Sequence, residues 1–417
     1  MRDPLKKAKT FSRIVTVFGA ILLAALCFAL VVFAARTDPI HWFTDKEPVE
    51  DFAFSFVVVG DTQNITQGRS QMLHTIFDYI VDNREEKKTA HVFHMGDIAT
   101  DYVTDEEWQV AAAAIGKMDG VIPYTLTRGN HDAKLQYEKY VCTEAYRSQF
   151  EGFFRNNDST NAYRLFSVCG NDFLILTLDH GPSDRVLNWA KKIIESYPER
   201  KVILVTHGYL AADGTPLDYK DKYAPTAEEN PQGVINNGDH LWDKLISKYE
   251  NIFMVLCGHI NSDDVVVSQS VGDHGNIVTQ VLVDNQYLDN DIDAGIVVQL
   301  YFSNDGRTVS VEQYSTLQKK FYRRQSQFDI TVPEFSTVEP PPSETTAEET
   351  TTLPEEPETT AQPEEPETTA APETVDETTT TPAPQSGCSS SIGGMSMIAV
   401  LPVMLSAFWV RTKKYRR

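Results

Sequence analysis

The sequence predicts a large α/β domain between residues 51 and 330, and two observations carry this prediction. Up to His259, apolar runs rich in β-branched and aromatic residues alternate with amphipathic helical patterns, as is typical of buried strands joined by helices. After His259 the pattern changes to strands alone, which fits one sheet packed on another. A chain of 417 residues has room for this domain and for further segments at its ends.

Five of the predicted strands end in a residue that can bind a metal ion. Each run delivers Asp, Asn or His at its carboxyl end, where open α/β sheets build their sites. One such residue alone is usually part of an ordinary turn, but five in succession predict a metal site made from strand-end loops. The five stretches are Phe54–Asp61, Val92–Asp97, Thr125–Asp132, Val202–Gly208 and Phe253–His259.

Apolar stripes at helical spacing lie between these strands and predict helices that pack on the core. They span Met72–Val81, Trp108–Ile115, Val186–Ile194 and Leu241–Tyr249. A hairpin is predicted where Tyr163–Val168 and Phe173–Leu178 are joined by a short polar segment. The later strands are predicted at Ile277–Val283, Gly295–Phe302 and Thr308–Tyr314.

The order Gly-Asp, Gly-Asp, Gly-Asn-His-Asp, Thr-His-Gly, Gly-His resembles the calcineurin-like metallophosphoesterase family over residues 54–329. The resemblance implies a four-layer α/β/β/α sandwich. It also implies an enzyme with two divalent metal ions (Mn, Mg, Fe or Zn), which hydrolyses a phosphoester by means of a hydroxide that bridges the ions.

The resemblance also implies a set of metal ligands. Asp97 is expected to bridge the two ions, and Asp61 is expected to bind the first. Asn130, His207 and His259 are expected to complete the second site.

The resemblance further implies that His131 is the general acid that protonates the leaving-group oxygen. Either Asp132 or Asp101 is expected to orient His131. Arg128 is close enough in sequence to reach a phosphate oxygen, although an arginine pointing into solvent is the commoner outcome.

The chain departs from the family pattern at two positions, where Gln63 and Asn261 replace histidines that belong to the first ion. Amide oxygens in place of imidazole nitrogens favour Mn or Mg over Zn, so the first site is expected to be weaker and rich in oxygen. Asp263 or Asp264 could add a carboxylate. The alternative is that the first site is empty and that the protein is a feeble enzyme.

Both ends of the chain carry apolar runs beside basic residues. Residues 1–35 are expected to be a signal peptide or an uncleaved N-terminal membrane anchor, and either one exports the residues that follow. Residues 331–387 are rich in Pro, Glu and Thr and predict a disordered stalk, with an acidic interaction tail as the competing interpretation. Residues 392–410 predict a transmembrane anchor, and residues 411–417 a basic cytoplasmic tail.

The distribution of charge along the sequence argues against nucleic acid as a binding partner. The net charge is −22, but the acidic excess is concentrated between Glu334 and Glu377, where no Lys or Arg occurs. No basic patch suggests nucleic acid. Cys142 and Cys169 could pair in an oxidising compartment, which the sequence leaves open, as it does the oligomeric state.

Two classes of function fit these observations. The first is an exported, membrane-anchored phosphoesterase with an extracellular catalytic domain, acting on a small-molecule or cell-envelope phosphoester. The second is a surface binding protein or adhesin built on a degenerate phosphoesterase fold.

Overall fold

The computed structural model describes residues 42–100, 104–228 and 235–338. The predicted N-terminal segment, the C-terminal anchor and tail, and the stalk beyond residue 338 lie outside the described residues, as does Asp101. Among the residues that are described, no helix has the length and apolar character needed to cross a membrane.

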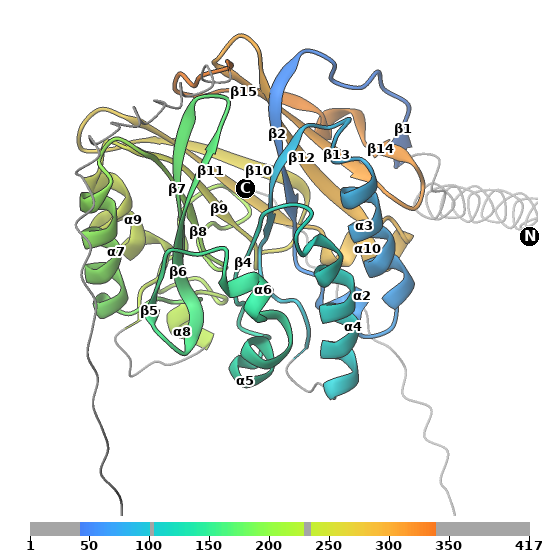
Figure 1. The fold of residues 1–417 in the computed structure, drawn as a ribbon, viewed down its shortest axis with the longest axis horizontal. Coiled ribbons are helices and arrows are strands. Elements are labelled where there is room, and N and C mark those ends of the chain that lie inside the picture. The colour runs from blue at the N-terminus through green and yellow to red at the C-terminus, as the bar shows by residue number, and fades with distance from the viewer. Residues whose placement is uncertain (1–41, 101–103, 229–234, 339–417) are drawn as a thin grey trace, which may run out of the picture. The chain divides into compact units, whose positions relative to one another are not determined.

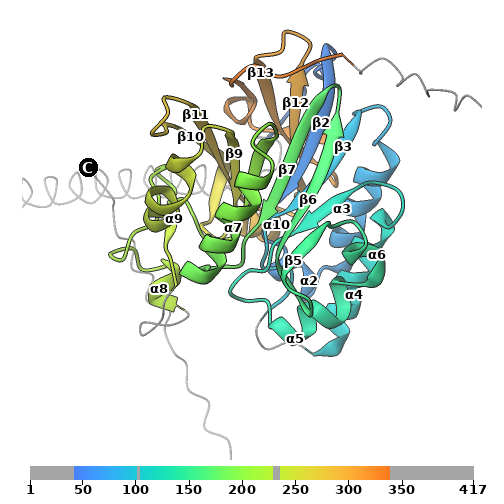
Figure 2. The ribbon, with the colours of Figure 1, turned by 60° about the vertical axis from the view of Figure 1, so that its left-hand side comes forward.

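Two β-sheets, each covered by helices on its outer face, form four layers (Figures 1 and 2). The order in the first sheet is β1-β14-β13-β12-β2-β3-β4, and β15 pairs with β13. Its strands are β1 (Phe43–Thr44), β2 (Phe52–Val59), β3 (Thr89–His94), β4 (Tyr124–Leu126), β12 (Ile296–Ser303), β13 (Thr308–Ser315), β14 (Lys320–Tyr322) and β15 (Phe328–Thr331).

The order in the second sheet is β10-β11-β9-β8-β7-β6-β5. Its strands are β5 (Gly152–Arg155), β6 (Asp158–Val168), β7 (Asn171–Thr177), β8 (Lys201–Val205), β9 (Ile252–Cys257), β10 (Ser262–Val271) and β11 (Ile277–Asp284).

The centre of each sheet is parallel. In the first sheet β2, β3 and β4 run in one direction, and in the second sheet β7, β8, β9 and β11 do so. Because the carboxyl ends of parallel strands meet at one edge of a sheet, this topology gathers the strand-end loops. The predicted hairpin is confirmed, since β6 and β7 pair antiparallel with Val168 opposite Asn171.

Four helices lie on the outer faces at the positions of the predicted apolar stripes (Figure 1). Helices α3 (Ser70–Asp82) and α4 (Asp105–Ile115) cover the first sheet, and α7 (Asp184–Ser196) and α9 (Gly238–Lys244) cover the second. The last predicted helix is shorter than expected, because α9 gives way to a 3-10 turn at Ile246–Lys248. The short helices are α2 (Gln63–Thr66), α5 (Lys134–Gln136), α6 (Glu144–Arg147), α8 (Pro225–Glu228) and α10 (Gln286–Ile292).

Strand β2 contributes side chains to two different layers of the core. Because successive strand side chains point to opposite faces, Phe54, Phe56 and Val58 pack between the two sheets, while Val57 and Val59 pack under the helices. The four-layer α/β/β/α sandwich expected from the sequence is therefore confirmed.

The core extends beyond the boundary that composition suggested at residue 331. Val332 and Phe335 are buried, and the Phe335 ring packs edge-on against Phe54 and Phe302. The folded region therefore reaches at least Phe335, because an aromatic residue inside the Pro/Glu/Thr-rich stretch packs on the core, and the stalk itself stays a prediction.

The structure does not pair the two cysteines. Cys142 and Cys169 form no disulfide and are buried, and they belong to different apolar clusters, one under the helices and one between the sheets.

Candidate metal centre

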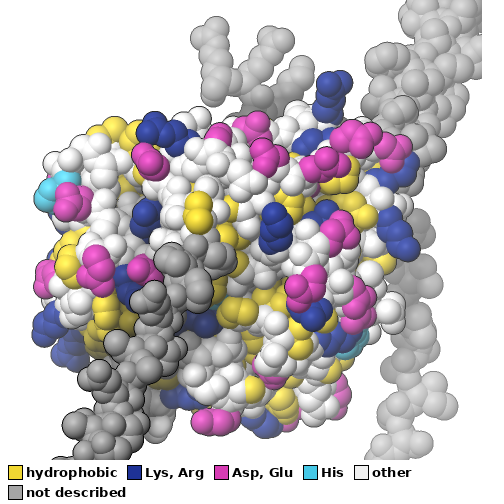
Figure 3. All heavy atoms as spheres, turned by 45° about the horizontal axis from the view of Figure 1, so that its top comes forward, with side chains coloured by type: hydrophobic (Ala, Val, Ile, Leu, Met, Phe, Trp, Pro, Cys, Tyr) yellow, Lys and Arg dark blue, Asp and Glu magenta, His cyan; other side chains and the backbone are white. Residues whose placement is uncertain are grey.

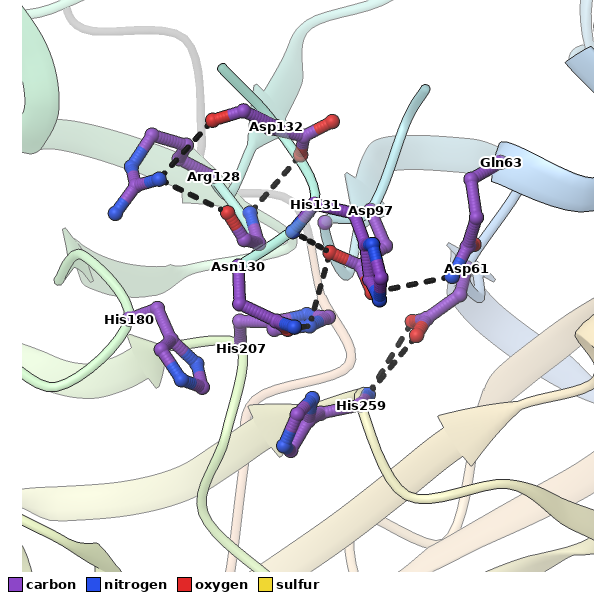
Figure 4. A network of polar contacts seen from close by, with 12 residues as sticks. Asp61, Gln63, Asp97, Arg128, Asn130, His131, Asp132, His180, His207 and His259 are labelled. Atoms are coloured by element: carbon purple, nitrogen blue, oxygen red, sulfur yellow. Dashed lines mark hydrogen bonds and ion pairs between the residues drawn. The ribbon is translucent and has the colours of Figure 1, made fainter. Parts of the chain in front are cut away.

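The strand-end loops of both sheets bring the predicted ligands together at one edge (Figure 4). From the first sheet, Asp61 follows β2, Asp97 follows β3 and Asn130 follows β4. From the second sheet, His207 follows β8 and His259 follows β9. Residues more than a hundred positions apart therefore meet because parallel strands end together.

Asp97 lies at the centre of this cluster. Its Oδ1 accepts the backbone N–H of His131 at 2.9 Å and lies 3.3 Å from Nε2 of His207, while its Oδ2 accepts Nε2–H of Gln63 at 3.1 Å. The φ of Asp97 is 46°, a left-handed conformation that is uncommon for a residue with a Cβ and that occurs at functional sites. Burial alone would raise the pKa of Asp97, but His207 and His131 outweigh it and lower that pKa to about 2.

The Gly-Asn-His-Asp motif needs its glycine at this point. A Cβ on Gly129 would lie 2.0 Å from Oδ1 of Asp97 and 2.4 Å from its backbone nitrogen. No side chain fits there, so the β4 loop can approach Asp97 only with glycine at this position.

His207 presents one nitrogen to the same cluster. Its Nδ1 lies 2.7 Å from the carbonyl oxygen of Met95, which accepts the ring N–H. That bond directs Nε2 towards Oδ1 of Asn130, at 3.1 Å, and towards Asp97. A histidine held in this way by a carbonyl has the tautomer and orientation of a metal ligand.

His259 joins the cluster less directly. Its backbone N–H donates to both carboxylate oxygens of Asp61, at 3.3 and 3.2 Å, from a left-handed φ of 75°. Its ring Nε2 lies 2.7 Å from the carbonyl oxygen of Tyr223 and 3.4 Å from Oε2 of Glu228. Because Nε2 is occupied in this way, Nδ1 is the nitrogen that could bind an ion. Burial, with His207 beside it, lowers the pKa of His259 to about 4, so the ring is neutral and able to bind.

The charge of the centre fits divalent cations. Burial raises the pKa of Asp61 well above its ordinary value, and the carboxylates of Asp284 and Asp97 raise it further. One ligand atom from each of Asp61, Asp97 and His207 lies within 4.8 Å of the others. Among the described residues, Oε1 of Gln63 is buried and has no hydrogen-bond partner. Clustered buried carboxylates and an unpaired acceptor are what a bound cation satisfies, so these residues fit the group that the resemblance implies.

The centre opens into a pocket of about 550 Å³, which Gln63, Asn130 and His131 line. Asn261 also lies on its wall, where it is exposed. His131 therefore faces the space in which a substrate would sit, as a general acid must. The binding of an ion by Gln63 or Asn261, and proton transfer by His131, stay predictions.

The carboxylate of Asp132 accepts two backbone N–H groups, and its expected role in orienting His131 stays a prediction. Its Oδ1 accepts the backbone N–H of Ala99 at 3.0 Å, and its Oδ2 accepts that of Gly129 at 2.9 Å. The residue is fully buried, and burial raises its pKa to about 7. Asp132 thus ties the loop after β3 to the loop after β4, which makes it a positioning residue.

Arg128 does not point into solvent. Its Nε donates to Oδ1 of Asp179 at 2.7 Å, and its Nη1 donates to the carbonyl oxygens of Gly129 and Asp132 at 3.1 and 3.0 Å. Arg128 therefore holds the loop after β4 in place through its contacts with Asp179, Gly129 and Asp132.

The additional carboxylates proposed for the first ion also lie elsewhere. Asp263 and Asp264 pair with the guanidinium of Arg323, at 3.4 and 3.8 Å. Of the acidic residues near Asp61, Asp284 at the end of β11 raises its pKa most, and burial raises the pKa of Asp284 itself to about 6.

Sequence reasoning missed His180, which lies beside His207 and His259 (Figure 4). It follows strand β7, where the apolar run ends in Leu178-Asp179-His180. This is the signal that identified the other five loops, so the same rule applied to β7 would have found it.

A family model for the calcineurin-like phosphoesterases matches residues 54–263 of this chain. An uncharacterized protein of Bacillus subtilis (strain 168), YvnB, is 26% identical over 255 residues, which are 58% of this chain and 18% of that protein. A probable glycerophosphodiester phosphodiesterase, GpdQ, of Arcobacter nitrofigilis is 26% identical over 186 residues, which are 43% of this chain and 59% of that protein. The chain thus spans less than two thirds of either relative.

Solved structures are similar at lower identity. The purple acid phosphatase PPD1 of yellow lupin has a TM-score of 0.42 and 15% identity, over 67% of this chain and 53% of that one. GAP50, the anchor in the inner membrane complex of Plasmodium, has a TM-score of 0.38 and 12% identity, over 69% of this chain and 91% of that one.

Proposed function

The chain belongs to the calcineurin-like phosphoesterase family, and from this premise we propose that it hydrolyses a phosphoester in a metal-dependent reaction. The observation that carries the proposal is the meeting of Asp61, Asp97 and His207 within 4.8 Å beside a pocket that His131 lines. Bound divalent ions would supply charge neutralisation for the phosphoryl oxygens and a water of lowered pKa.

The side chains of the site would hold the ions and transfer the proton. His207 contacts both Asn130 and Asp97, and these three residues would hold an ion together, with Asp61 close to Asp97 and His207. The backbone N–H of His131 is held by Asp97, which places its ring next to that centre and in the pocket. From there His131 would donate a proton to the leaving-group oxygen, so that the alcohol departs neutral.

The pocket wall favours a phosphodiester over a dianionic monoester. Among the described residues that line it there is no Lys or Arg, whereas phosphate dianions are commonly bound by such side chains. Amides and tyrosines line it instead: Gln63, Asn64, Gln67, Asn130, Asn261, Gln286, Tyr223 and Tyr287. A singly charged diester with polar or ring-shaped substituents suits this wall. The name of the relative from Arcobacter nitrofigilis is consistent with a diester.

A nucleic-acid partner receives no support from the surface that Figure 3 displays. On that face, Lys and Arg side chains are interspersed with Asp and Glu, and apolar groups lie between them. A nucleic-acid footprint would gather basic side chains in one patch or stripe.

The experiment is hydrolysis of bis(4-nitrophenyl) phosphate and of 4-nitrophenyl phosphate by purified protein. The protein is first stripped with a chelator and then given Mn²⁺, Mg²⁺ or Zn²⁺. We expect activity to return with metal and to be higher on the diester, and we expect Asp97→Asn to abolish it. Arg307→Gln is a matched control, because Arg307 lies on the surface and pairs with Glu334. If no metal restores activity to the stripped wild type, the proposal fails, and the binding-protein alternative is favoured.

We further propose that the domain acts outside the cell and is held to the membrane by its terminal segments. The support is the sequence alone: a basic stretch before an apolar run near the N-terminus, and a second apolar run before a basic end. Protease added to intact cells should release the domain by cutting within residues 339–387. Cleavage seen only after lysis would contradict this topology.

A further inference from the structure

His180 is a buried histidine with no ordinary hydrogen-bond partner. It is 2% exposed, and within the described ranges neither Nδ1 nor Nε2 of its ring makes a hydrogen bond. Buried polar side-chain atoms in native proteins nearly always have a partner, so an imidazole with two unpaired nitrogens calls for an explanation. A histidine that merely filled space in the core would be expected to bond through at least one ring nitrogen, as His91 does through Nε2 to the Thr125 hydroxyl.

The ring of His180 faces two histidines that the site already contains (Figure 4). Its centroid lies 5.4 Å from that of His207 and 4.9 Å from that of His259, which are themselves 4.8 Å apart. One nitrogen from each of the three rings lies within 4.8 Å of the others. Three imidazoles from three different strand-end loops thus surround one point.

The surroundings select which nitrogens remain for an ion. Nε2 of His207 is directed inward by the bond from Nδ1 to Met95. Oε2 of Glu228 lies 3.4 Å from Nε2 of His259 and 3.8 Å from Nε2 of His180. A carboxylate beside one ring nitrogen can hold a histidine in place and leaves the other nitrogen of that ring as the candidate ligand atom.

The neighbouring backbone makes room for this third ring. A Cβ on Gly208 would lie 2.8 Å from Cε1 of His180, 3.0 Å from its Nδ1 and 3.3 Å from Cδ2 of His259. The His180 backbone is fixed as well, because its N–H donates to Oδ1 of Asp179, which Arg128 also holds. The loop after β7 therefore delivers the ring to a defined place.

We propose that His180 is a metal ligand that acts with His207 and His259, and that this three-histidine end of the centre binds a borderline transition metal such as Zn²⁺. Imidazole suits Zn and the other late first-row ions, whereas carboxylates and amides suit Mn and Mg. The centre is thereby divided into a nitrogen-rich end and an oxygen-rich end around Asp61, Asp97 and Gln63. The inference rests on the proposed metal dependence but not on any substrate.

The test measures metal binding directly, with Zn²⁺ alone as the ligand. Chelator-stripped full-length wild type, His180→Phe and His274→Gln are titrated by calorimetry, and Co²⁺ complexes are compared by visible absorption. His274→Gln is the matched control, since this exposed histidine bonds to the Lys248 carbonyl and does not belong to the metal centre. We expect His180→Phe to weaken zinc binding at least about tenfold to a hundredfold, as loss of even an indirect partner of a ligand does, and to alter the Co²⁺ bands. The control should match wild type.

Folding is followed by thermal unfolding of the metal-free proteins. His180→Phe keeps a planar aromatic ring, although a larger one, and removes two ring nitrogens that make no hydrogen bond, so we expect it to unfold close to wild type. If it does not fold, His180→Gln, which stays polar, takes its place. If the folded variant binds zinc as tightly as wild type and its Co²⁺ bands are unchanged, His180 is not a ligand, while the proposed function is unaffected. Absence of metal binding in wild type would overturn both this inference and the proposed function.

Discussion

Replacing Arg128 by methionine should destabilise the fold more than the loss of a surface ion pair would. The Arg128 and Asp179 side chains are only 11% and 17% exposed, and the guanidinium also serves the carbonyl oxygens of Gly129 and Asp132. It joins the loop after β4 in one sheet to the loop after β7 in the other. Methionine keeps much of the apolar stem but leaves the Asp179 charge and two carbonyl groups without this partner.

The size of the effect follows from these contacts. Breaking a buried pair costs about 3–5 kcal/mol, because one charge stays buried and unpaired. The slight exposure of both side chains places this pair near the lower end, at about 3 kcal/mol. That loss corresponds to a roughly 100-fold larger unfolded fraction, or to a fall in Tm of roughly 6–12 °C.

The assay is urea unfolding of metal-free protein, with two comparison variants. Arg307→Met removes the pair with Glu334, whose side chains are 67% and 74% exposed, and should cost no more than about 1 kcal/mol. Arg128→Met combined with Asp179→Asn should recover part of the loss, because no charge is then stranded. If Arg128→Met costs no more than the surface control, the bracing role assigned to Arg128 is wrong.

Three further changes test the site and the core. His131→Ala should lower kcat by about two to four powers of ten on alkyl esters and by less on nitrophenyl esters, whose leaving groups need little protonation; equal losses on both would exclude a general acid. Gln63→His combined with Asn261→His should tighten the weaker metal site and shift its preference towards Zn²⁺, as metal content after dialysis would show. Burial lowers the pKa of His91 well below its ordinary value of 6.5, so the unfolded chain binds a proton first as pH falls, and folding stability is lost below about pH 6.5. His91→Gln should remove up to about 1.4 kcal/mol per pH unit of that loss, and identical stability curves would contradict the assignment.

Much of the fold was predictable from local patterns. The continuous apolar run that begins at Phe54 and helical stripes such as that of α3 depend on neighbours a few positions away, and both are confirmed. The strand-end residues Asp61, Asp97, Asn130, His207 and His259 were identifiable because parallel strands must end at a common edge, whatever their distance in sequence.

The contacts among side chains were not predictable in this way, because they depend on how loops from two sheets approach one another. Asp263, close in sequence to His259, pairs with Arg323, while Asp284 from another strand influences Asp61. Asp132 follows His131 directly, yet its carboxylate accepts backbone N–H groups behind the pocket.

His180 shows the same limit most clearly. Its own sequence context, an apolar strand followed by Asp-His, marks it as a candidate ligand but does not say which residues it meets. Only the packing of β7 beside β8, with Gly208 leaving room, sets its ring against His207 and His259. Periodicity and motif spacing are properties of one segment, whereas a ligand set is a property of several segments whose relative positions are fixed by the packed core.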